Sequence, residues 1–264
     1  MPTNKSKTAK IISVTNQKGG VGKTTTTINL AAALSQLKKK VLIIDLDPQG
    51  NASTGLGVEV EDRELSTYEF LVEGVPLEKV TIETEISGLN IVPATIDLSS
   101  ADIDLISNEK RSHLLHAALR KKQQDKQKYD YILIDCPPSL NILTVNAMVA
   151  SHSVLIPLQS EFFALEGLSQ LLLTVKEVRQ TANENLRVEG IVLTMFDGRN
   201  NLSKQVEADA RSNLRELVFK TIIPRNVRVS EAPSYSMPVL TYDPSSKGSK
   251  AYMSLAKELL ANNS

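Results

Sequence analysis

The chain is poor in cysteine and in aromatic residues. Among its 264 residues it has one cysteine, Cys136, no tryptophan and only 4% aromatic side chains. A single cysteine excludes an intramolecular disulfide and a cysteine-built zinc site, and it fits a reducing, cytoplasmic setting. A core without aromatic bulk must be aliphatic, and the hydrophobic fraction of 41% is large enough to build one.

The chain also lacks an excess of either charge, because 30 basic residues balance 30 acidic ones. Overall charge therefore predicts neither nucleic-acid nor membrane binding, and any such activity must come from a local patch. No apolar run is long enough to span a membrane. The three histidines, His113, His116 and His152, show no metal-binding spacing with a carboxylate. The first residues are polar and basic, and we expect 1–10 to be a short disordered tail.

Apolar runs alternate with helix-like segments along the chain. Several of the runs are almost continuous Ile, Leu and Val, which is typical of parallel strands buried on both faces. The predicted strands are 11–15, 41–47, 89–93, 131–136, 154–158, 190–195 and 221–223, and the predicted helices are 24–37, 112–122, 141–150, 165–181, 203–217 and 249–260. This alternation predicts an α/β fold with a doubly wound, mostly parallel sheet flanked by helices.

The most informative motif is the glycine-rich run between the first predicted strand and the first helix. A strand, a glycine turn and a helix N-terminus form the usual phosphate-binding loop, in which backbone N–H groups surround phosphate oxygens. Lys23 adds a cation, and the Thr24 hydroxyl can ligate magnesium. The predicted nucleotide contacts are Gly19, Gly20, Val21, Gly22, Lys23, Thr24 and Thr25.

This loop departs from the usual G-x-x-x-x-G-K-[ST] pattern. Gln17 stands where the first glycine belongs, and a second lysine, Lys18, follows it. One nucleotide needs only one loop lysine for its phosphates, so Lys18 requires another explanation.

Two apolar strands end in aspartate. The first ends in Asp45 and Asp47, and the other ends in Asp135. Ligands of such sheets bind at the carboxyl ends of the strands, and a strand-end carboxylate beside a phosphate-binding loop orients the hydration shell of the metal. We therefore predict a magnesium site formed by Thr24, Asp135 and Asp47. Cys136 has no histidine near it in sequence and is interpreted as a small core residue.

These motifs together resemble the deviant-Walker-A ATPases, and most closely the ParA/Soj chromosome-partitioning proteins. The resemblance spans roughly residue 10 to the end of the chain. The matching segments are 16–25 (NQKGGVGKTT), 45–51 (DLDPQGN), 135–139 (DCPPS), 163–168 (FALEGL) and 223–234 (IPRNVRVSEAPS). The resemblance implies a single ATPase domain of this type over residues 11–264, with ATP and Mg²⁺ as ligands.

The resemblance also implies a mechanism. Members of the family form an ATP-sandwich homodimer that binds double-stranded DNA without sequence preference, and a ParB/Spo0J-like partner stimulates hydrolysis and release. Lys18 matches the lysine that crosses to the other subunit's nucleotide, where it stabilises charge on the transferring phosphoryl group. Asp47 matches the carboxylate that positions the attacking water. Lys18, Lys23 and Asp47 are thus the expected catalytic residues, and the expected location is cytoplasmic and nucleoid-associated.

Two further sets of residues follow from the resemblance. The segment expected to contact adenine comprises Pro224, Arg225 and Asn226. Met195 is a further expected base contact, with a core methionine as the alternative interpretation. Arg199 and Arg228 match basic DNA contacts of the family. By charge alone, Lys204, Lys247 and Lys250 are further DNA-contact candidates.

Other readings of the same loop are less compatible with the chain. A MinD-like membrane ATPase would need a basic amphipathic helix at the carboxyl end, whereas residues 255–264 carry one lysine and one glutamate. A nitrogenase-type reductase needs paired cysteines for its cluster. A biosynthetic ligase such as dethiobiotin synthetase would lack the second loop lysine coupled to Asp-Pro-Gln-Gly-Asn. Since the loop begins at Lys18, we expect no amino-terminal operator-reading domain.

Overall fold

A seven-stranded sheet forms the centre of the molecule. We analysed a computed structural model, which describes residues 8–106, 108–120, 128–161 and 163–263. The strand order is β3-β4-β2-β5-β1-β6-β7, and all neighbouring strands are parallel except β3 and β4. The strands are β1 (Lys10–Val14), β2 (Val41–Asp45), β3 (Ile82–Glu83), β4 (Leu89–Val92), β5 (Tyr131–Asp135), β6 (Ser153–Gln159) and β7 (Arg187–Thr194). The predicted fold class is confirmed.

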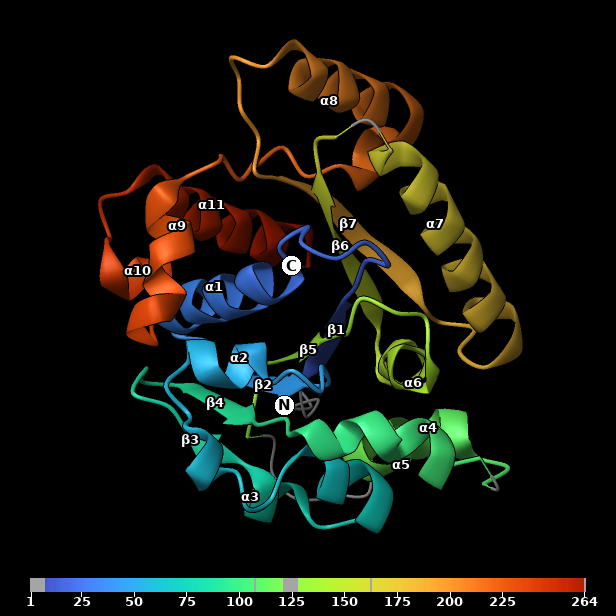
Figure 1. Cartoon of the computed structure of the whole chain (residues 1–264). Helices are drawn as coiled ribbons and strands as arrows, with labels where there is room; N and C mark the ends of the chain where they lie inside the picture. The colour runs from blue at the N-terminus through green and yellow to red at the C-terminus, as the bar shows by residue number, and fades with distance from the viewer. Residues whose placement is uncertain (1–7, 107, 121–127, 162, 264) are drawn as a thin grey trace, which may run out of the picture.

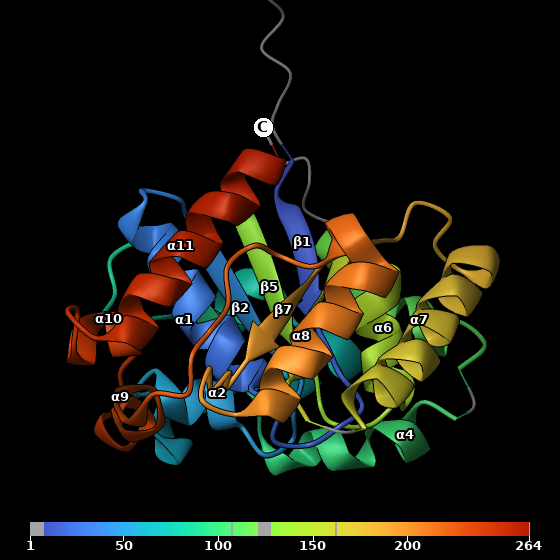
Figure 2. The same cartoon turned by 90° about the horizontal axis from the view of Figure 1, so that it is seen from above.

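Helices cover both faces of this sheet (Figures 1 and 2). Helices α1 and α11 pack together on one face, and α5, α6 and α7 cover the other. The helices are α1 (Lys23–Gln36), α2 (Asn51–Gly55), α3 (Leu77–Val80), α4 (Ala101–Asp104), α5 (Leu114–Arg120), α6 (Ile142–Ala150), α7 (Ala164–Thr181), α8 (Asn201–Leu214), α9 (Val227–Glu231), α10 (Val239–Tyr242) and α11 (Lys247–Asn262).

The core is aliphatic, as the composition requires. The central strands β2 and β5 are buried at every residue, so their alternate side chains enter the clusters on the two faces. On one face, Ile43 and Leu133 pack with residues of α1 and α11, and Tyr252 of α11 is one of the few fully buried aromatic residues there. Burial of this kind contributes roughly 25 cal/mol per Å² of apolar surface, so the sheet and its helices form a rigid base for the loops at its carboxyl edge.

Several sequence expectations need correction. Residues 221–223 form no strand: the segment makes a backbone hydrogen bond from Ile223 to Leu193 (2.8 Å) and then one isolated bridge, Phe196 to Pro224. Strand β3 was not predicted, because two residues give no detectable alternation. Lys10 belongs to β1 rather than to the predicted tail. Residues 1–7 of that tail lie outside the described residues, and so do residues 121 and 122 of the predicted helix 112–122.

Candidate nucleotide-binding site

The glycine-rich loop connects β1 to the N-terminus of α1 at the carboxyl edge of the sheet. Gly20 and Gly22 have φ angles of 75° and 86°, in the left-handed region that residues with a Cβ rarely adopt. Gly22 is the N-cap of α1, and no side chain caps this helix. The first N–H groups of a 14-residue helix are therefore left to face the cavity, together with the positive end of the helix dipole, which suits phosphate oxygens.

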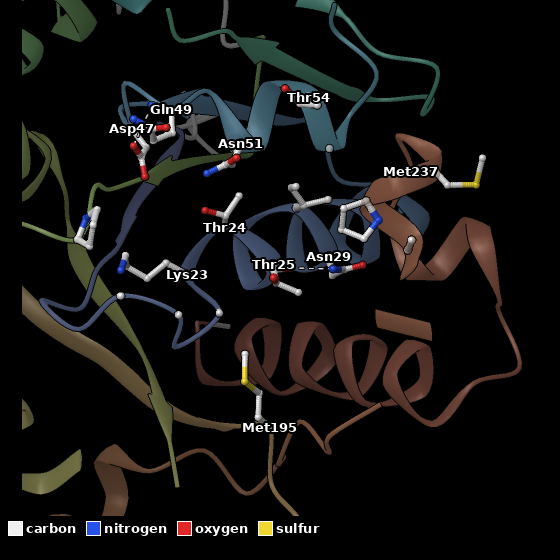
Figure 3. Close-up of a pocket in the computed structure, with 18 residues that line it drawn as sticks. Lys23, Thr24, Thr25, Asn29, Asp47, Gln49, Asn51, Thr54, Met195 and Met237 are labelled. Carbon is white, nitrogen blue, oxygen red and sulfur yellow. Dashed lines mark hydrogen bonds between the residues drawn. The ribbon is translucent and has the colours of Figure 1, made fainter. Parts of the chain in front are cut away.

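These groups line a cavity of about 600 Å³. Figure 3 shows Lys23 and Thr24 on one side of the cavity, and Asp47 and Gln49 from the loop after β2 and Asn51 from α2 opposite them. Of the predicted loop contacts, Gly19, Gly20, Gly22, Lys23, Thr24 and Thr25 line the cavity. Val21 does not: its side chain is buried, and its carbonyl accepts a hydrogen bond from the Thr194 hydroxyl (2.8 Å).

The two loop lysines lie in different environments. Lys23 is only 7% exposed, and its Nζ donates to the carbonyl of Lys18 (3.0 Å). Burial lowers the pKa of Lys23, and the carboxylates of Asp135 and Asp47 partly oppose this effect. The Lys18 side chain, in contrast, is 42% exposed and reaches outward to an ion pair with Glu161, so its ammonium lies outside the set of groups that line the cavity.

Asp45 and Asp135 end the two central strands, and Asp47 lies two residues after β2. Asp45 and Asp135 lie opposite each other in the β2–β5 register, and both are fully buried. Asp45 accepts hydrogen bonds from the Ser53 N–H (3.0 Å), the Ser53 hydroxyl (2.8 Å) and the Asp47 N–H (3.2 Å). Asp45 therefore organises the loop, whereas Asp47 lines the cavity.

Asp135 has the features of a group that faces a cation. One carboxylate oxygen accepts a hydrogen bond from the Thr27 hydroxyl (2.9 Å), and the other is buried without a hydrogen-bond partner among the described residues. Burial raises the pKa of Asp135, and the charge of Asp45 raises it further. A hydrated Mg²⁺ ion would supply both the missing partner and the opposing charge.

The donor set therefore fits magnesium, although within the described residues no group of three or more His, Cys, Asp or Glu side chains could hold a metal by itself. Mg²⁺ usually keeps several waters and takes one or two protein ligands plus nucleotide phosphates. Thr24 and Asp47 line the cavity, and the Thr24 hydroxyl is close enough to Asp135 to lower the pKa of that carboxyl, so the three predicted metal residues are brought together.

The far end of the cavity is apolar. Ile28 of α1 and Ala232, Pro233 and Met237 line it, whereas Met195 lines the cavity beside the loop, 3.7 Å from the position that a Cβ on Gly22 would take. In Figure 3, Met195 approaches from one side and Met237 lies at the opposite end from Lys23. An apolar surface of this kind can hold a planar base. Of the base contacts expected from the sequence, only Met195 lines the cavity.

Pro224, Arg225 and Asn226 do not line the cavity. Backbone pairing of Phe196 with Pro224 and Arg225 draws this segment alongside the end of β7. Asn226 lies against Gly248, with its Oδ1 buried and without a hydrogen-bond partner in the described part of the chain. The adenine contacts assigned to these three residues therefore remain a prediction.

The sequence analysis did not predict about half of the residues that line the cavity. The missed residues are Ile28, Asn29, Gln49, Asn51, Thr54, Gly55, Pro138, Ala232, Pro233 and Met237. Several of them lie in segments 45–51, 135–139 and 223–234, which carried the family resemblance, so a signal was present without a residue-level role.

The predicted DNA contacts all lie on the surface. Arg199 is 91% exposed at the side chain and forms a two-pronged ion pair with Asp197. Arg228 pairs with Glu231 and Asp243. The exposed lysines Lys204, Lys247 and Lys250 lie on α8 and α11, and no interaction given for the described residues joins these five basic side chains.

Comparison with known proteins agrees with this geometry. Residues 9–188 match a family described as an AAA domain. The chain is 51% identical to the sporulation initiation inhibitor protein Soj of Bacillus subtilis, over 96% of this chain and 99% of that protein. It is 50% identical to the chromosome partitioning protein ParA of Caulobacter vibrioides, over 96% and 94%.

The chain belongs to the ParA/Soj family. Among solved structures, it also resembles a protein described as cobyrinic acid a,c-diamide synthase from Mycobacterium smegmatis with bound ADP and magnesium. The TM-score is 0.82, with 36% identity over 96% of this chain and 94% of that one. The ParA/Soj relatives are thus closer in sequence. No helix in the described part of the chain combines the length and apolar character needed to cross a membrane.

Proposed function

We propose that the chain is an ATP-dependent DNA-partitioning ATPase. In this proposal it dimerises around ATP and Mg²⁺, binds double-stranded DNA without sequence preference, and is released when a ParB-like partner stimulates hydrolysis during chromosome or plasmid segregation. The identity of about half of the residues with Soj and ParA over nearly the full chain supports this.

The observation that carries the proposal is the different placement of Lys18 and Lys23. Lys23 is buried in the cavity, where it can serve the nucleotide of its own chain, while the Lys18 ammonium faces outward at the rim. A cation at that place suits a second nucleotide carried by another copy of the chain. Two ATP molecules brought face to face repel each other, and one lysine from each side would reduce that repulsion.

The carboxyl-terminal helix supports DNA rather than membrane as the larger partner. Tyr252, Leu255 and Leu259 of α11 are fully buried, because this helix packs along α1 in the core. The apolar face that a membrane-binding helix would insert into lipid is thus already occupied.

The test is steady-state phosphate release with ATP alone, with plasmid DNA, with the ParB-like protein of the same organism, and with both. We expect slow turnover by the isolated protein and a large increase with both additions. Co-sedimentation with DNA and with anionic liposomes, with and without ATP, distinguishes DNA from membrane binding. Fast turnover that DNA and partner leave unchanged would favour a biosynthetic enzyme, such as the synthase named for the Mycobacterium smegmatis structure.

A further inference from the structure

A buried arginine lies against the loop that carries Asp47. Arg63 follows a short helical turn, Val60–Asp62, and is only 7% exposed. None of the ion pairs within the described residues includes it. Its hydrogen-bond partners are instead neutral oxygens: the carbonyl of Val58, the carbonyl of Ala94 and the hydroxyl of Thr54.

Burial of the Arg63 guanidinium is unfavourable in free energy. A guanidinium removed from water without a carboxylate loses more solvation than neutral oxygens return, and an apolar side chain of similar volume would cost less. Arginine is nevertheless suited to one task, because its planar fork directs several donors in fixed directions at once. Here the fork donates to Val58 (3.2 and 2.6 Å), to Ala94 (3.2 Å) and to Thr54 (2.8 Å).

The Arg63 guanidinium contacts two segments beside the cavity, and the first is α2 together with the segment after β4. Thr54 belongs to α2 and lines the cavity, and Ala94 follows the end of β4. The Ala94 N–H donates to the Ser53 hydroxyl (3.0 Å), so α2 is joined to the end of β4 through both polar groups of Ala94.

The second segment is the turn at Gly50. A Cβ on Gly50 would lie 2.4 Å from Nη1 of Arg63 and 3.0 Å from the Ala94 carbonyl oxygen, so Arg63 packs directly on this backbone. Gly50 has a φ angle of 61°, and its N–H donates to the carbonyl of Asp47 (2.9 Å). Asp47 is thereby connected to Arg63 through one backbone hydrogen bond and one close packing contact.

We propose that Arg63 is a positioning residue for ATP hydrolysis, which holds Gly50 and α2 so that Asp47 keeps the orientation needed to align the attacking water. The inference rests on the proposed ATPase function and deepens it. Arg63 touches neither nucleotide nor water in this role. Displacing an aligned group by about 1 Å can reduce a rate roughly a hundredfold, so a loosened turn affects turnover more than nucleotide binding.

The test compares Arg63→Lys and Thr54→Val with the control Arg211→Lys. Arg211 also donates to backbone carbonyls, those of Phe219 and Lys220, but it lies away from the cavity. For Arg63→Lys we expect kcat to fall about tenfold, with the affinity for a fluorescent ATP analogue within about twofold of wild type. Thr54→Val should lower kcat less, and the double variant should be less than additive, because both changes act through α2.

Amide hydrogen exchange without nucleotide gives a readout independent of turnover. Exchange at residues 50–55 should become about tenfold faster in Arg63→Lys and stay unchanged in Arg211→Lys. A wild-type kcat in Arg63→Lys, unchanged exchange, or loss of ATP affinity in parallel with kcat would each overturn the inference. If Arg63→Lys does not fold, a wild-type kcat in Thr54→Val overturns it alone. Wild-type protein without any ATP turnover would instead refute the proposed function.

Discussion

The different environments of the two loop lysines lead to a quantitative prediction. We consider Lys23→Met and Lys18→Met, which remove each ammonium and keep most of the side-chain volume. Lys23 is buried in the cavity, so in a nucleotide complex its ammonium would exchange the Lys18 carbonyl for phosphate oxygens. Hydrogen bonds to charged partners contribute about 1.5–3 kcal/mol each, and two of them correspond to roughly a hundredfold to ten-thousandfold in Kd.

Lys18→Met should behave differently. Within the described residues, its ammonium makes a half-exposed ion pair with Glu161, and pairs of this kind contribute about 0–1 kcal/mol. Loss of Lys18 should therefore change the Kd for ATP less than about fivefold. Since its charge is expected to act on the nucleotide of a second copy, ATP-dependent dimers should be absent in this variant.

The assays are titration of a fluorescent ATP analogue and size-exclusion chromatography with light scattering, in the presence of Mg²⁺. Thermal melting without nucleotide serves as the folding control. Lys23→Met should not lose much stability there, because burial of the Lys23 ammonium is itself unfavourable, as its lowered pKa indicates. Equal losses of ATP affinity in the two variants, or ATP-dependent dimers of Lys18→Met, would refute the separation of roles.

Three further predictions concern hydrolysis, DNA and stability. Asp47→Ala should bind ATP and remain dimeric on size-exclusion chromatography, because the loss affects water alignment; a monomer or normal turnover would contradict this. Arg199→Ala and Arg228→Ala should weaken binding to unrelated DNA sequences equally, and the slope of log affinity against log salt should become shallower by about one per contact removed. Glu189→Gln should cost about 3 kcal/mol in urea unfolding at pH 7. Burial raises the pKa of Glu189, but hydrogen bonds, the first of them from Lys10, outweigh this effect and lower its pKa. The stability that ionised Glu189 contributes is therefore present above the usual glutamate pKa, and it is lost as pH falls through the lowered pKa of the folded state.

The parts of the fold that the sequence predicted are those set by local pattern. Continuous Ile, Leu and Val runs identified six of the seven strands, because parallel strands buried on both faces typically carry such runs. The glycines of the phosphate-binding loop were predictable for a similar reason, because the left-handed φ angles of Gly20 and Gly22 are specified at the residues themselves. The failed strand at 221–223 had the composition of a strand but lacked a neighbour able to pair along its length.

The apolar far end of the cavity could not be predicted in this way, because it is formed by segments that are distant in the sequence. Asn29 of α1 accepts a hydrogen bond from the N–H of Val239 (2.8 Å), which ties the segment containing Pro233 and Met237 to the helix that begins at the phosphate-binding loop. No local pattern encodes a contact between residues 210 positions apart. Arg63 illustrates the same limit, since a lone arginine between acidic residues is usually solvated and only the three-dimensional structure shows it buried against Gly50.

The electrostatics of the strand ends connect the fold to nucleotide binding. The parallel register of β2 and β5 places Asp45 opposite Asp135, and burial, followed by repulsion between neighbouring carboxylates, raises the pKa of both. A carboxyl group whose pKa is raised on folding adds stability at low pH, and that stability is lost as pH rises through the folded pKa. At neutral pH, the nucleotide-free fold therefore carries an electrostatic cost at the carboxyl edge, even though the buried Lys23 ammonium interacts with the carboxylates of Asp135 and Asp47. A ligand that brings Mg²⁺ to Asp135 removes part of that cost. The register that pairs β2 with β5 therefore also favours binding of a metal-bound nucleotide over binding of the nucleotide alone.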